Sequence, residues 1–432
     1  MSNIWKIYIL AVVSFLVGTS EYIISGILDQ IAGALDISIG AAGQLITVFS
    51  LVYGIGTPIL MAFTAAMDRR KLMLLSLGIF VVANVLSFVL PGFGWFIAAR
   101  VIMALGAGMV VVTALSIAAQ IAPAGKQASS IATVIMGFTA SLIIGVPLGR
   151  VIASSFGWKA VFVGIALLGI LAMIVIRFTI PRLQGDKPVP LAGQLAMLKN
   201  PKIALALAIT FFWLGGYSIA YTYISPYLLQ VAGMGEGLLS TALLAFGIAS
   251  LIGSKAGGFS ADKKGVNFTL AAGMIIHIAS LILLPFAANS PIAVFAVLML
   301  WSFSAWTTGP TQQYNLVTLA PESSGVMLSL NSSMNQLAMA AGAGIGGVAV
   351  GQVSLTSITW FGAIGVVIAL LGVWGLARLR RQAKPAQTGS SEAGQTGSTE
   401  AEQFAASGAA QLQAAEAAGK DSGCPRVSGQ GA

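Results

Sequence analysis

The chain has 432 residues, of which 57% are hydrophobic and only 8% are charged. Soluble domains carry about 25% charged residues, so water is not the solvent for most of this surface, and a soluble globular domain is excluded. The formal net charge of +9 would suit a nucleic-acid-binding protein, but the placement of the basic residues argues against that class as well.

Runs of about twenty apolar residues, each long enough to cross ~30 Å of hydrocarbon, recur from Trp5 to Leu376. The runs do not alternate in polarity, so they are not strands of a transmembrane barrel. We predict an all-α polytopic membrane protein of about twelve transmembrane helices. The first span is too long for a cleaved signal peptide and is expected to stay in the membrane. In chain order, the predicted spans are 5–27, 41–66, 72–90, 95–121, 128–153, 160–180, 203–230, 238–261, 268–287, 291–318, 325–350 and 355–377.

The longest polar connection, residues 181–202, divides the membrane region into halves of similar size. We predict an N-terminal bundle over 1–180 and a C-terminal bundle over 203–382, each of about six helices. Residues 383–432 are rich in Gly, Ser, Ala, Gln and Glu, which cannot bury a core, so a disordered cytoplasmic tail is predicted. The single cysteine, Cys424, lies in that tail, and neither a disulfide nor a metal or cofactor site is expected.

Basic residues cluster in alternate connections between the predicted spans. The intervening connections hold Asp29, Asp36 and Glu236, with Lys159 as the main basic exception. By the positive-inside rule, both termini and every second connection are predicted to be cytoplasmic, in a protein of the cell membrane. A nucleic-acid-binding surface would not alternate in this way. The basic connections hold Arg69, Arg70 and Lys71, then Lys126, then Arg182, Lys187, Lys199 and Lys202, then Lys263 and Lys264, and finally Arg378, Arg380 and Arg381.

Glu21 is the one acid within the apolar stretch 9–28, where a carboxylate costs roughly 2.5–3.5 kcal/mol. Counted from the span ends, Glu21 lies ~9 Å from the outer surface, and Arg100, in the oppositely directed fourth span, lies ~7.5 Å from it. We predict that this acid and base couple transport to protons, because charges inside a membrane are usually functional and tolerable when paired. The alternatives are a static contact of Glu21 with Arg100 or Tyr22, and a substrate contact or helix-carbonyl hydrogen bonds for Arg100.

Other polar residues in the spans have simpler interpretations. Arg150 sits near the outer end of its span and is expected to snorkel to the interface, as is Lys255 at the cytoplasmic end of the eighth span. Asp29 is expected to set the charge of the outer mouth, with a second titrating role as the alternative. Gly145 and Gly149 allow close helix contact, and Pro147 between them bends its helix.

A substrate cavity should combine aromatic faces with uncharged hydrogen-bonding groups. Aromatic rings can stack on a flat heterocycle, and amides can read its edge. The alternative for each aromatic residue taken singly is packing or an interfacial anchor. The seventh, tenth and eleventh spans supply the candidates, which are Trp213, Tyr217, Tyr221, Trp301, Trp306, Gln312, Asn331 and Asn335.

The two halves repeat one another. The sequence AFTAAMDRRK (62–71) follows the second span and GFSADKKG (258–265) follows the eighth, and each ends a helix in a short basic turn. Repeats related by an axis along the membrane normal are typical of transporters, whose binding site lies between the halves near mid-depth. The sequence therefore favours a transporter over helices assembled only for packing.

These motifs resemble the major facilitator superfamily, specifically its drug:proton antiporter branch. The second-half turn is similar to the superfamily's loop motif at Gly258, Asp262, Lys263 and Gly265. The first-half copy is degenerate, with Ala62 and Ala66 in place of Gly and Asp but with Asp68 and Arg70 nearby, so the resemblance implies a weak or rearranged charge lock there.

Two further stretches are similar to the antiporter branch. RVIMALGAG (100–108) resembles its fourth-helix motif, with Met103 and Ala104 in place of Gln and Gly, and GFTASLIIGVPLG (137–149) resembles its fifth-helix motif. That resemblance implies that Gly145, Pro147 and Gly149 form a bend that seals one side of the cavity. It also places the ninth helix at the bundle periphery, so His277 is expected to take a hydrogen-bonded packing position.

Within the branch, the chain looks most like bacterial purine base and nucleoside efflux pumps, over about residues 5–380. We predict a proton-coupled antiporter that exports purine bases or nucleosides first, and drugs such as chloramphenicol second, by alternating access. Proton-coupled uptake is the alternative, because the same groups serve the opposite cycle. The expected partners are a small organic substrate, protons and the lipid bilayer, and the protein is expected to be a monomer.

Two other classes are weighed against transport. A membrane enzyme would need a nucleophile–base pair or metal ligands, which one histidine and one tail cysteine do not supply. A non-transporting receptor or scaffold is a remote alternative, because it would not need an acid and a base at matched depth.

Overall fold

A computed structural model of the chain describes residues 3–123, 127–185, 196–320 and 324–382, and the regular elements in these ranges are all helical. The N-terminal half contains α1 (Asn3–Gly26), α2 (Leu28–Leu35), α3 (Ile39–Phe63), α4 (Arg69–Val89), α5 (Phe93–Ile121), α6 (Gln127–Ala140), the π-helix η1 (Ser141–Gly145), α7 (Val146–Phe156) and α8 (Lys159–Thr179). The C-terminal half contains the 3-10 helix η2 (Met197–Lys199), α10 (Pro201–Thr222), α11 (Ile224–Gln230), α12 (Glu236–Lys264), α13 (Val266–Ala287), α14 (Pro291–Leu319), α15 (Ser324–Gln352) and α16 (Ser357–Gln382). The predicted tail, 383–432, lies outside the described residues.

Within the described residues, 11 helices are long and apolar enough to cross a membrane. The predicted all-α polytopic fold is therefore confirmed. The predicted eleventh span corresponds to α15, which is 29 residues long but is not among these helices. The reason is its content of amides, Asn331, Asn335 and Gln336, which a helix packed against α3, α10 and α14 tolerates.

Helix ends follow ordinary capping chemistry. The Ser38 hydroxyl accepts from the amide of Ala41 at the start of α3, and the Asp68 carboxylate accepts from that of Lys71 at the start of α4. Gly265 ends α12 with a φ of 84°, which glycine adopts without the steric penalty of a β-carbon. Short polar or glycine-containing turns therefore fix where one long helix stops and the next begins.

Two predicted spans are interrupted in the structure. The predicted span 203–230 consists of α10 and α11, which meet at Tyr223. The predicted span 128–153 contains η1 between α6 and α7, with Pro147 directly after the π-helical turn. Proline has no amide hydrogen and its ring crowds the preceding turn, so the helix does not continue regularly through this point.

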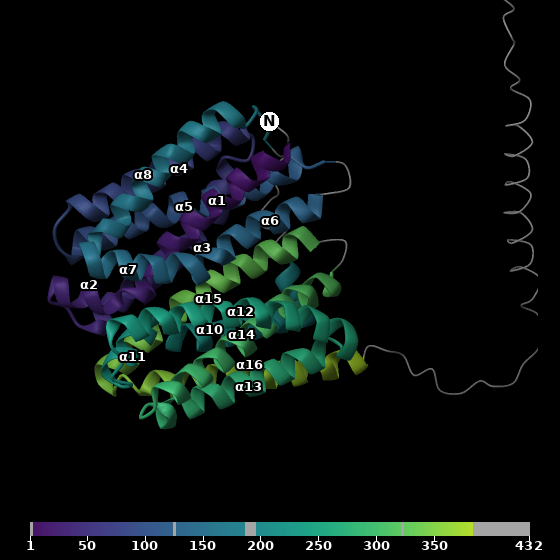
Figure 1. The fold of residues 1–432 in the computed structure, drawn as a ribbon. Helices are drawn as coiled ribbons and strands as arrows, with labels where there is room; N and C mark the ends of the chain where they lie inside the picture. Colours follow the sequence, from purple (N-terminus) through teal and green to yellow (C-terminus); the bar gives the residue numbers. More distant parts are fainter. Residues whose placement is uncertain (1–2, 124–126, 186–195, 321–323, 383–432) are drawn as a thin grey trace, which may run out of the picture. The chain divides into compact units, whose positions relative to one another are not determined.

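Successive long helices run in alternating directions, so their ends form two faces. The face at which α4 begins at Arg69 and α12 ends at Lys264 is called the basic face. The face that holds α2 and α11 is called the opposite face. The start of α1 and the end of α16 lie toward the same end of the helices (Figure 1). The first helix of each half, α1 or α10, breaks at the opposite face and continues as a short helix.

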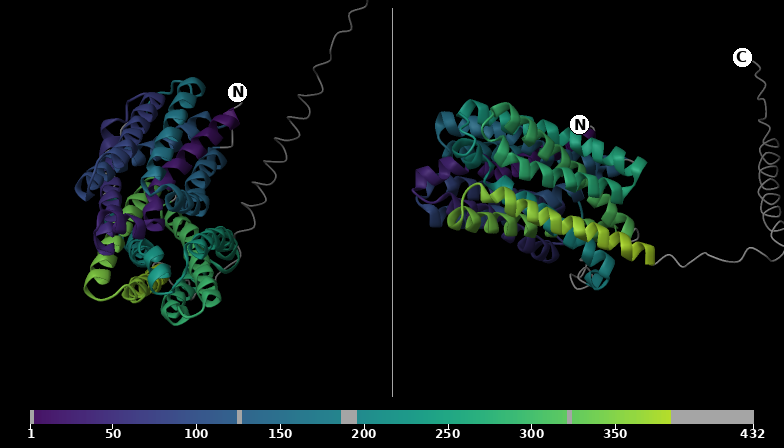
Figure 2. Two further views of the ribbon diagram at one scale, coloured as in Figure 1. Left: turned by 60° about the vertical axis from the view of Figure 1, so that its left-hand side comes forward. Right: turned by 90° about the horizontal axis from the view of Figure 1, so that it is seen from below.

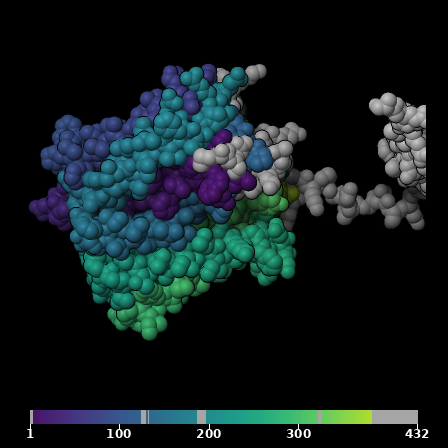
Figure 3. Space-filling model, turned by 45° about the horizontal axis from the view of Figure 1, so that its top comes forward, coloured from purple at the N-terminus to yellow at the C-terminus, as the bar shows by residue number. Residues whose placement is uncertain are grey.

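The halves meet through a small set of helices. α3 packs along α15, α12 packs against η1 and α7, and α11 contacts α1 and α2. Figures 1 and 2 show α3 and α15 side by side, and Figure 3 shows the two halves meeting along a seam. An ideal β-carbon on Gly40 would lie 2.7 Å from the Gly347 carbonyl oxygen. Small residues thus let α3 and α15 approach closely at the opposite face.

Candidate functional site

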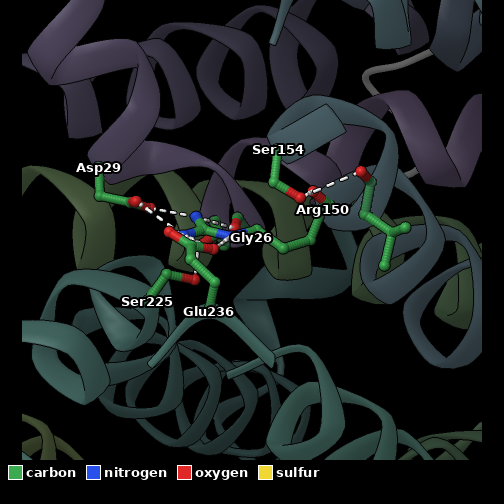
Figure 4. A network of polar contacts seen from close by, with 8 residues as sticks. Gly26, Asp29, Arg150, Ser154, Ser225 and Glu236 are labelled. Atoms are coloured by element: carbon green, nitrogen blue, oxygen red, sulfur yellow. Dashed lines mark hydrogen bonds and ion pairs between the residues drawn. The ribbon is translucent and has the colours of Figure 1, made fainter. Parts of the chain in front are cut away.

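The break in α1 supplies backbone acceptors at the seam between the halves. α1 ends at Gly26, and the last carbonyls of a helix have no partner inside it. The Ser225 hydroxyl of α11 donates a 2.7 Å hydrogen bond to the carbonyl oxygen of Ser25. Arg150 of α7 donates a 2.9 Å bond to the carbonyl oxygen of Gly26, and Figure 4 shows these groups close together. The end of α1 is therefore tied to elements of both halves.

Arg150 is fully buried although it lies near the end of its span. Its guanidinium bonds both carboxylate oxygens of Asp29 in α2, with 2.8 Å between Nη2 and Oδ2. Nη2 also lies 2.7 Å from each carboxylate oxygen of Glu236, which begins α12. The prediction that Arg150 snorkels to the interface was wrong, because the buried guanidinium bonds instead to the largely buried Asp29 and to Glu236, whose side chain is 53% exposed.

We call Asp29, Arg150 and Glu236 the Arg150 cluster (Figure 4). Two of its members belong to the N-terminal half and Glu236 belongs to the C-terminal half. The Glu236 side chain is 53% exposed, so solvent screens its pair with Arg150, and the pair contributes less than the roughly 3–5 kcal/mol of a fully buried ion pair. The cluster therefore holds the two halves together at the opposite face.

Glu21 lies in α1 at the seam and is only 3% exposed. Its Oε1 accepts a 3.0 Å hydrogen bond from Nε2 of Gln336 in α15. Its Oε2 has no hydrogen-bond partner among the described residues. The side chain thus points to the other half of the protein rather than to lipid, and only one of its two oxygens is engaged.

Arg100 lies level with the neighbour of Glu21 in α1, since it bonds to Ser20, but it does not form the expected direct pair with Glu21. Its Nη1 donates a 2.9 Å bond to the carbonyl oxygen of Ser20 and lies 3.3 Å from the Met103 sulfur. Its guanidinium carbon sits 4.0 Å from the centre of the Phe49 ring, a cation–π contact. A helix-carbonyl bond beside Glu21, one of the alternatives from the sequence, is what the structure shows.

Aromatic side chains of the C-terminal half gather next to Glu21. Tyr217 and Tyr221 are stacked, with ring centres 5.1 Å apart, and both lie near Phe246 of α12. Tyr22, which follows Glu21 in α1, is close enough to Tyr217 and Tyr221 to interact electrostatically. Aromatic faces and the buried acid therefore occupy one region of the seam.

Trp301 lies deeper in this aromatic group. It is fully buried, and its Nε1 donates a 2.7 Å bond to Nε2 of His277. Its ring centre is 5.6 Å from that of Tyr217. His277 therefore has the hydrogen-bonded packing position predicted for it, and Trp301 packs behind the tyrosines.

Several buried polar atoms near the seam have no hydrogen-bond partner among the described residues. Besides Glu21 Oε2, they include Gln336 Oε1, Arg100 Nε and Nη2, and Trp213 Nε1. Buried polar groups in proteins nearly always have a partner in the protein or in water. Buried donors and acceptors without partners in the described part of the chain indicate where water, a proton or a polar ligand can bind.

The remaining residues predicted for the cavity differ in their contacts. Gln312 donates to the carbonyl oxygen of Ala206 at 2.7 Å and to the Thr210 hydroxyl at 3.1 Å. The same hydroxyl donates to Asn331 at 3.1 Å, so Gln312 and Asn331 join helices of the C-terminal half. Asn335 is half-buried, as is Trp306, which lies beside Tyr217.

The two loop-motif copies make different contacts at the basic face. In the first half, Asp68 caps α4 and Arg70 donates a 3.2 Å bond to the Ile180 carbonyl oxygen, so the acid and the base both bond to backbone. In the second half, Lys263 lies 4.4 Å from the centre of the Phe259 ring. Asp262 and Gly258 are exposed, and an ideal β-carbon on Gly258 would meet no atom within 4 Å.

The fifth-helix motif packs on α1. A β-carbon on Gly145 would collide with the Thr19 side chain, and one on Gly149 would collide with Ile23. Pro147 is buried between them. Because η1 and α7 also contact α12, this irregular segment joins the helix that carries Glu21 to the C-terminal half.

Three residues of the site were not singled out from the sequence in the roles they have here. Gln336 was passed over in favour of Asn331 and Asn335, and Glu236 was read only as a loop charge. Ser225 carried no signal at all. A mid-span amide was the one available clue for Gln336, whereas the other two depend on which helices meet.

Comparison with known proteins shows to which family this architecture belongs. The chain matches the family model described as Major Facilitator Superfamily over residues 10–343. It belongs to the Major Facilitator Superfamily. It is therefore a multi-pass membrane transporter, as the sequence motifs predicted.

The transporter has relatives of nearly its own length. It is 69% identical over 371 residues to the uncharacterized MFS-type transporter YbcL of Bacillus subtilis, covering 86% of this chain and 95% of the relative. It is 30% identical over 370 residues to the inner membrane transport protein YdhP of Escherichia coli, covering 85% of this chain and 95% of that one.

Solved structures share the transporter's fold. A bacterial homolog of the human lysosomal transporter Spinster, in an inward-facing and unoccupied conformation, has a TM-score of 0.70 at 18% identity, over 89% of this chain and 99% of that chain. A D-xylose-proton symporter has a TM-score of 0.69 at 16% identity, over 87% and 98%. At these identities the likeness concerns the fold alone.

Proposed function

We propose that this transporter is a proton-coupled antiporter that exports small, flat organic molecules, purine bases or nucleosides first and drugs such as chloramphenicol second. One observation carries the proposal: Glu21, an acid inside the membrane, bonds across the seam to Gln336, and its second oxygen has no hydrogen-bond partner in the described part of the chain. An intramembrane acid at the contact between moving halves is where a proton can alter that contact.

The chemistry of the pair supports coupling. An ionised Glu21 only accepts hydrogen bonds, as it does from Gln336 Nε2, whereas a protonated carboxyl also has an O–H donor. Gln336 Oε1 is an acceptor without a partner among the described residues. Protonation of Glu21 therefore changes which hydrogen bonds cross the seam. Because these bonds differ between the two conformations of an alternating-access cycle, proton binding shifts the equilibrium between them.

The contacts between the halves support a conformation closed at the opposite face. The Arg150 cluster and the bond from Ser225 to Ser25 both lie there. If the basic face is cytoplasmic, as the positive-inside rule predicts, this is an inward-facing state with both termini in the cytoplasm. The substrate would then meet Tyr217, Tyr221, Trp213 and Trp306 beside Glu21, in a transporter that acts as a monomer.

Inverted membrane vesicles with an acidic interior test the proposal. An antiporter uses protons that leave the vesicle to accumulate substrate inside, and the assay compares hypoxanthine, guanosine, chloramphenicol and arabinose. We expect gradient-dependent accumulation by the wild-type protein, and accumulation reduced to the level without a gradient in E21Q at equal protein in the membrane. Proton-driven loss of substrate from the vesicles would mean symport, and uphill accumulation by E21Q would remove Glu21 from the mechanism.

A further inference from the structure

A basic pocket lies at the basic face between α4, α8 and the segment that follows α8, away from the seam between the halves. It has a volume of about 520 Å³ and is lined by Asp68, Arg70, Lys71, Leu74, Arg177 and Arg182. These residues carry four positive charges and one negative charge. The proposed transport cycle makes no use of this pocket.

Hydrogen bonds fix the walls of the pocket. The amide of Arg69 donates a 2.9 Å bond to the Leu183 carbonyl oxygen, and the amide of Leu183 donates a 3.0 Å bond to Asp68 Oδ2. Arg70 closes the end of α8 through its 3.2 Å bond to Ile180. The segment after α8 is thus tied back across the start of α4, which brings Arg182 beside Lys71.

The negative charge in the pocket is already engaged, whereas three of the positive charges are not. Asp68 accepts the amides of Lys71 at 2.8 Å and of Leu183 at 3.0 Å. The side chains of Lys71, Arg177 and Arg182 are exposed, and no hydrogen bond or ion pair joins them to another residue in the described part of the chain. The pocket therefore has free cationic groups held near one another by a bonded backbone.

The equivalent turn of the second half serves as an internal comparison. There, Lys263 lies 4.4 Å from the ring centre of Phe259, and Lys264 lies 5.1 Å from that of Phe268. Aromatic rings thus contact the cations at the end of α12, whereas those around the start of α4 converge on an open pocket. A general excess of positive charge at this face does not explain the difference.

The position of the pocket in the protein indicates which kind of ligand binds there. α4 begins at Arg69 and α8 ends at Thr179, so the pocket lies where these two spans meet the membrane surface. Leu75, Ile174 and Phe178 beside it are exposed, Phe178 to 81%, as expected for residues that contact acyl chains. Arginine pairs of this kind suit the oxygens of a phosphate.

We propose that this pocket binds the phosphate headgroup of an anionic phospholipid of the adjacent leaflet. The headgroup phosphate contacts Lys71, Arg177 and Arg182, and the acyl chains lie along the apolar surface of α4 and α8. Basic pockets at the cytoplasmic ends of transmembrane helices attract anionic lipids in this way.

Native mass spectrometry of the purified full-length protein tests the site, with phosphatidylglycerol and phosphatidylcholine as probes. We expect the wild-type protein to retain phosphatidylglycerol preferentially, and R177Q/R182Q to retain it on the order of tenfold less. The matched control, K263Q/K264Q, removes the same charge from the second-half turn and should retain phosphatidylglycerol like the wild type. K71Q provides a second, single substitution if the double variant fails to fold.

Three outcomes would overturn the proposal. Equal loss in R177Q/R182Q and K263Q/K264Q would mean that overall charge, and not the pocket, attracts the lipid. Equal loss of phosphatidylcholine would point to a damaged protein surface. Displacement of phosphatidylglycerol by millimolar inorganic phosphate would identify a site for soluble anions instead of lipid.

Discussion

At the scale of single residues, Glu21 and Arg100 lie at the same depth but bond to different partners. Arg100 bonds to the Ser20 carbonyl oxygen, and Glu21 bonds to Gln336 in the other half. The base is therefore anchored within its own half, whereas the acid contacts the half that moves relative to it. This division suits an acid that responds to conformation and a base that keeps a fixed positive charge nearby.

The bond between Glu21 and Gln336 leads to a residue-scale prediction. Q336A removes the donor that crosses the seam to the Glu21 carboxylate, and a hydrogen bond to a charged group contributes about 1.5–3 kcal/mol. We expect proton-driven accumulation in vesicles to fall about tenfold or more. N335A is the matched control, since Asn335 is the neighbouring amide on α15 and is half-buried. Equal effects of the two substitutions would show that the Gln336 bond has no special role.

At the scale of elements, the irregular fifth span positions the helix that carries Glu21. η1 and α7 contact α1 on one side and α12 on the other. Glycines at the contact with α1 allow the backbones to approach, and Pro147 follows the π-helical turn. A segment of this kind can transmit a change at the seam because it touches both halves.

The close contact between Gly145 and α1 can be tested by substitution. An added β-carbon in G145A meets the Thr19 side chain, and overpacking of this kind costs typically 1–3 kcal/mol. We expect a lower thermal unfolding midpoint in detergent and slower transport. G164A adds the same methyl group within α8 where no atom lies within 4 Å and should leave both properties unchanged. A wild-type unfolding midpoint for G145A would contradict the close contact with α1.

At the scale of the whole molecule, the Arg150 cluster is the main charged contact between the halves at the opposite face. Alternating access requires that the halves separate there at some point in the cycle. The two carboxylates that bond to the buried Arg150 guanidinium stabilise the state that is closed at the opposite face. These bonds must break when that face opens. The cluster therefore sets how strongly the closed state is favoured.

E236Q tests this role of the cluster. It removes the carboxylate of the C-terminal half and leaves Arg150 paired with Asp29. Because the Glu236 side chain is 53% exposed, solvent screens the lost pair, and the cost should be well below the roughly 3–5 kcal/mol of a broken buried pair. Leu228 of α11 lies at the opposite face and is 0% exposed. We expect a shift toward states open at this face, seen as faster labelling of L228C by a membrane-impermeant thiol reagent in a C424S background. D36N, at an exposed acid of the opposite face outside the cluster, is the control. Unchanged labelling in E236Q would show that the cluster does not hold the halves closed.

Much of the fold could be predicted from the sequence, because a bilayer demands long apolar helices whose backbone groups bond internally. The spans, the repeated basic turns and the family follow from local patterns of residues. The matching level of Glu21 and Arg100 along neighbouring helices also follows, since helix rise converts sequence position into distance. The break at Tyr223 was missed because apolar composition does not record where a helix changes its hydrogen bonding, whereas Pro147 indicated the bend in the fifth span beside η1.

The partners of the charged residues could not be predicted in the same way. Arg150 was expected at the interface, and Glu21 was expected to meet Arg100, because sequence position gives depth but not rotation about the helix axis or the choice of neighbouring helix. Those two quantities decide whether a charge meets lipid, water or a carboxylate. The sequence by itself determined which residues lie at which depth in the membrane, and only the tertiary structure decided which of them bond across the seam between the halves.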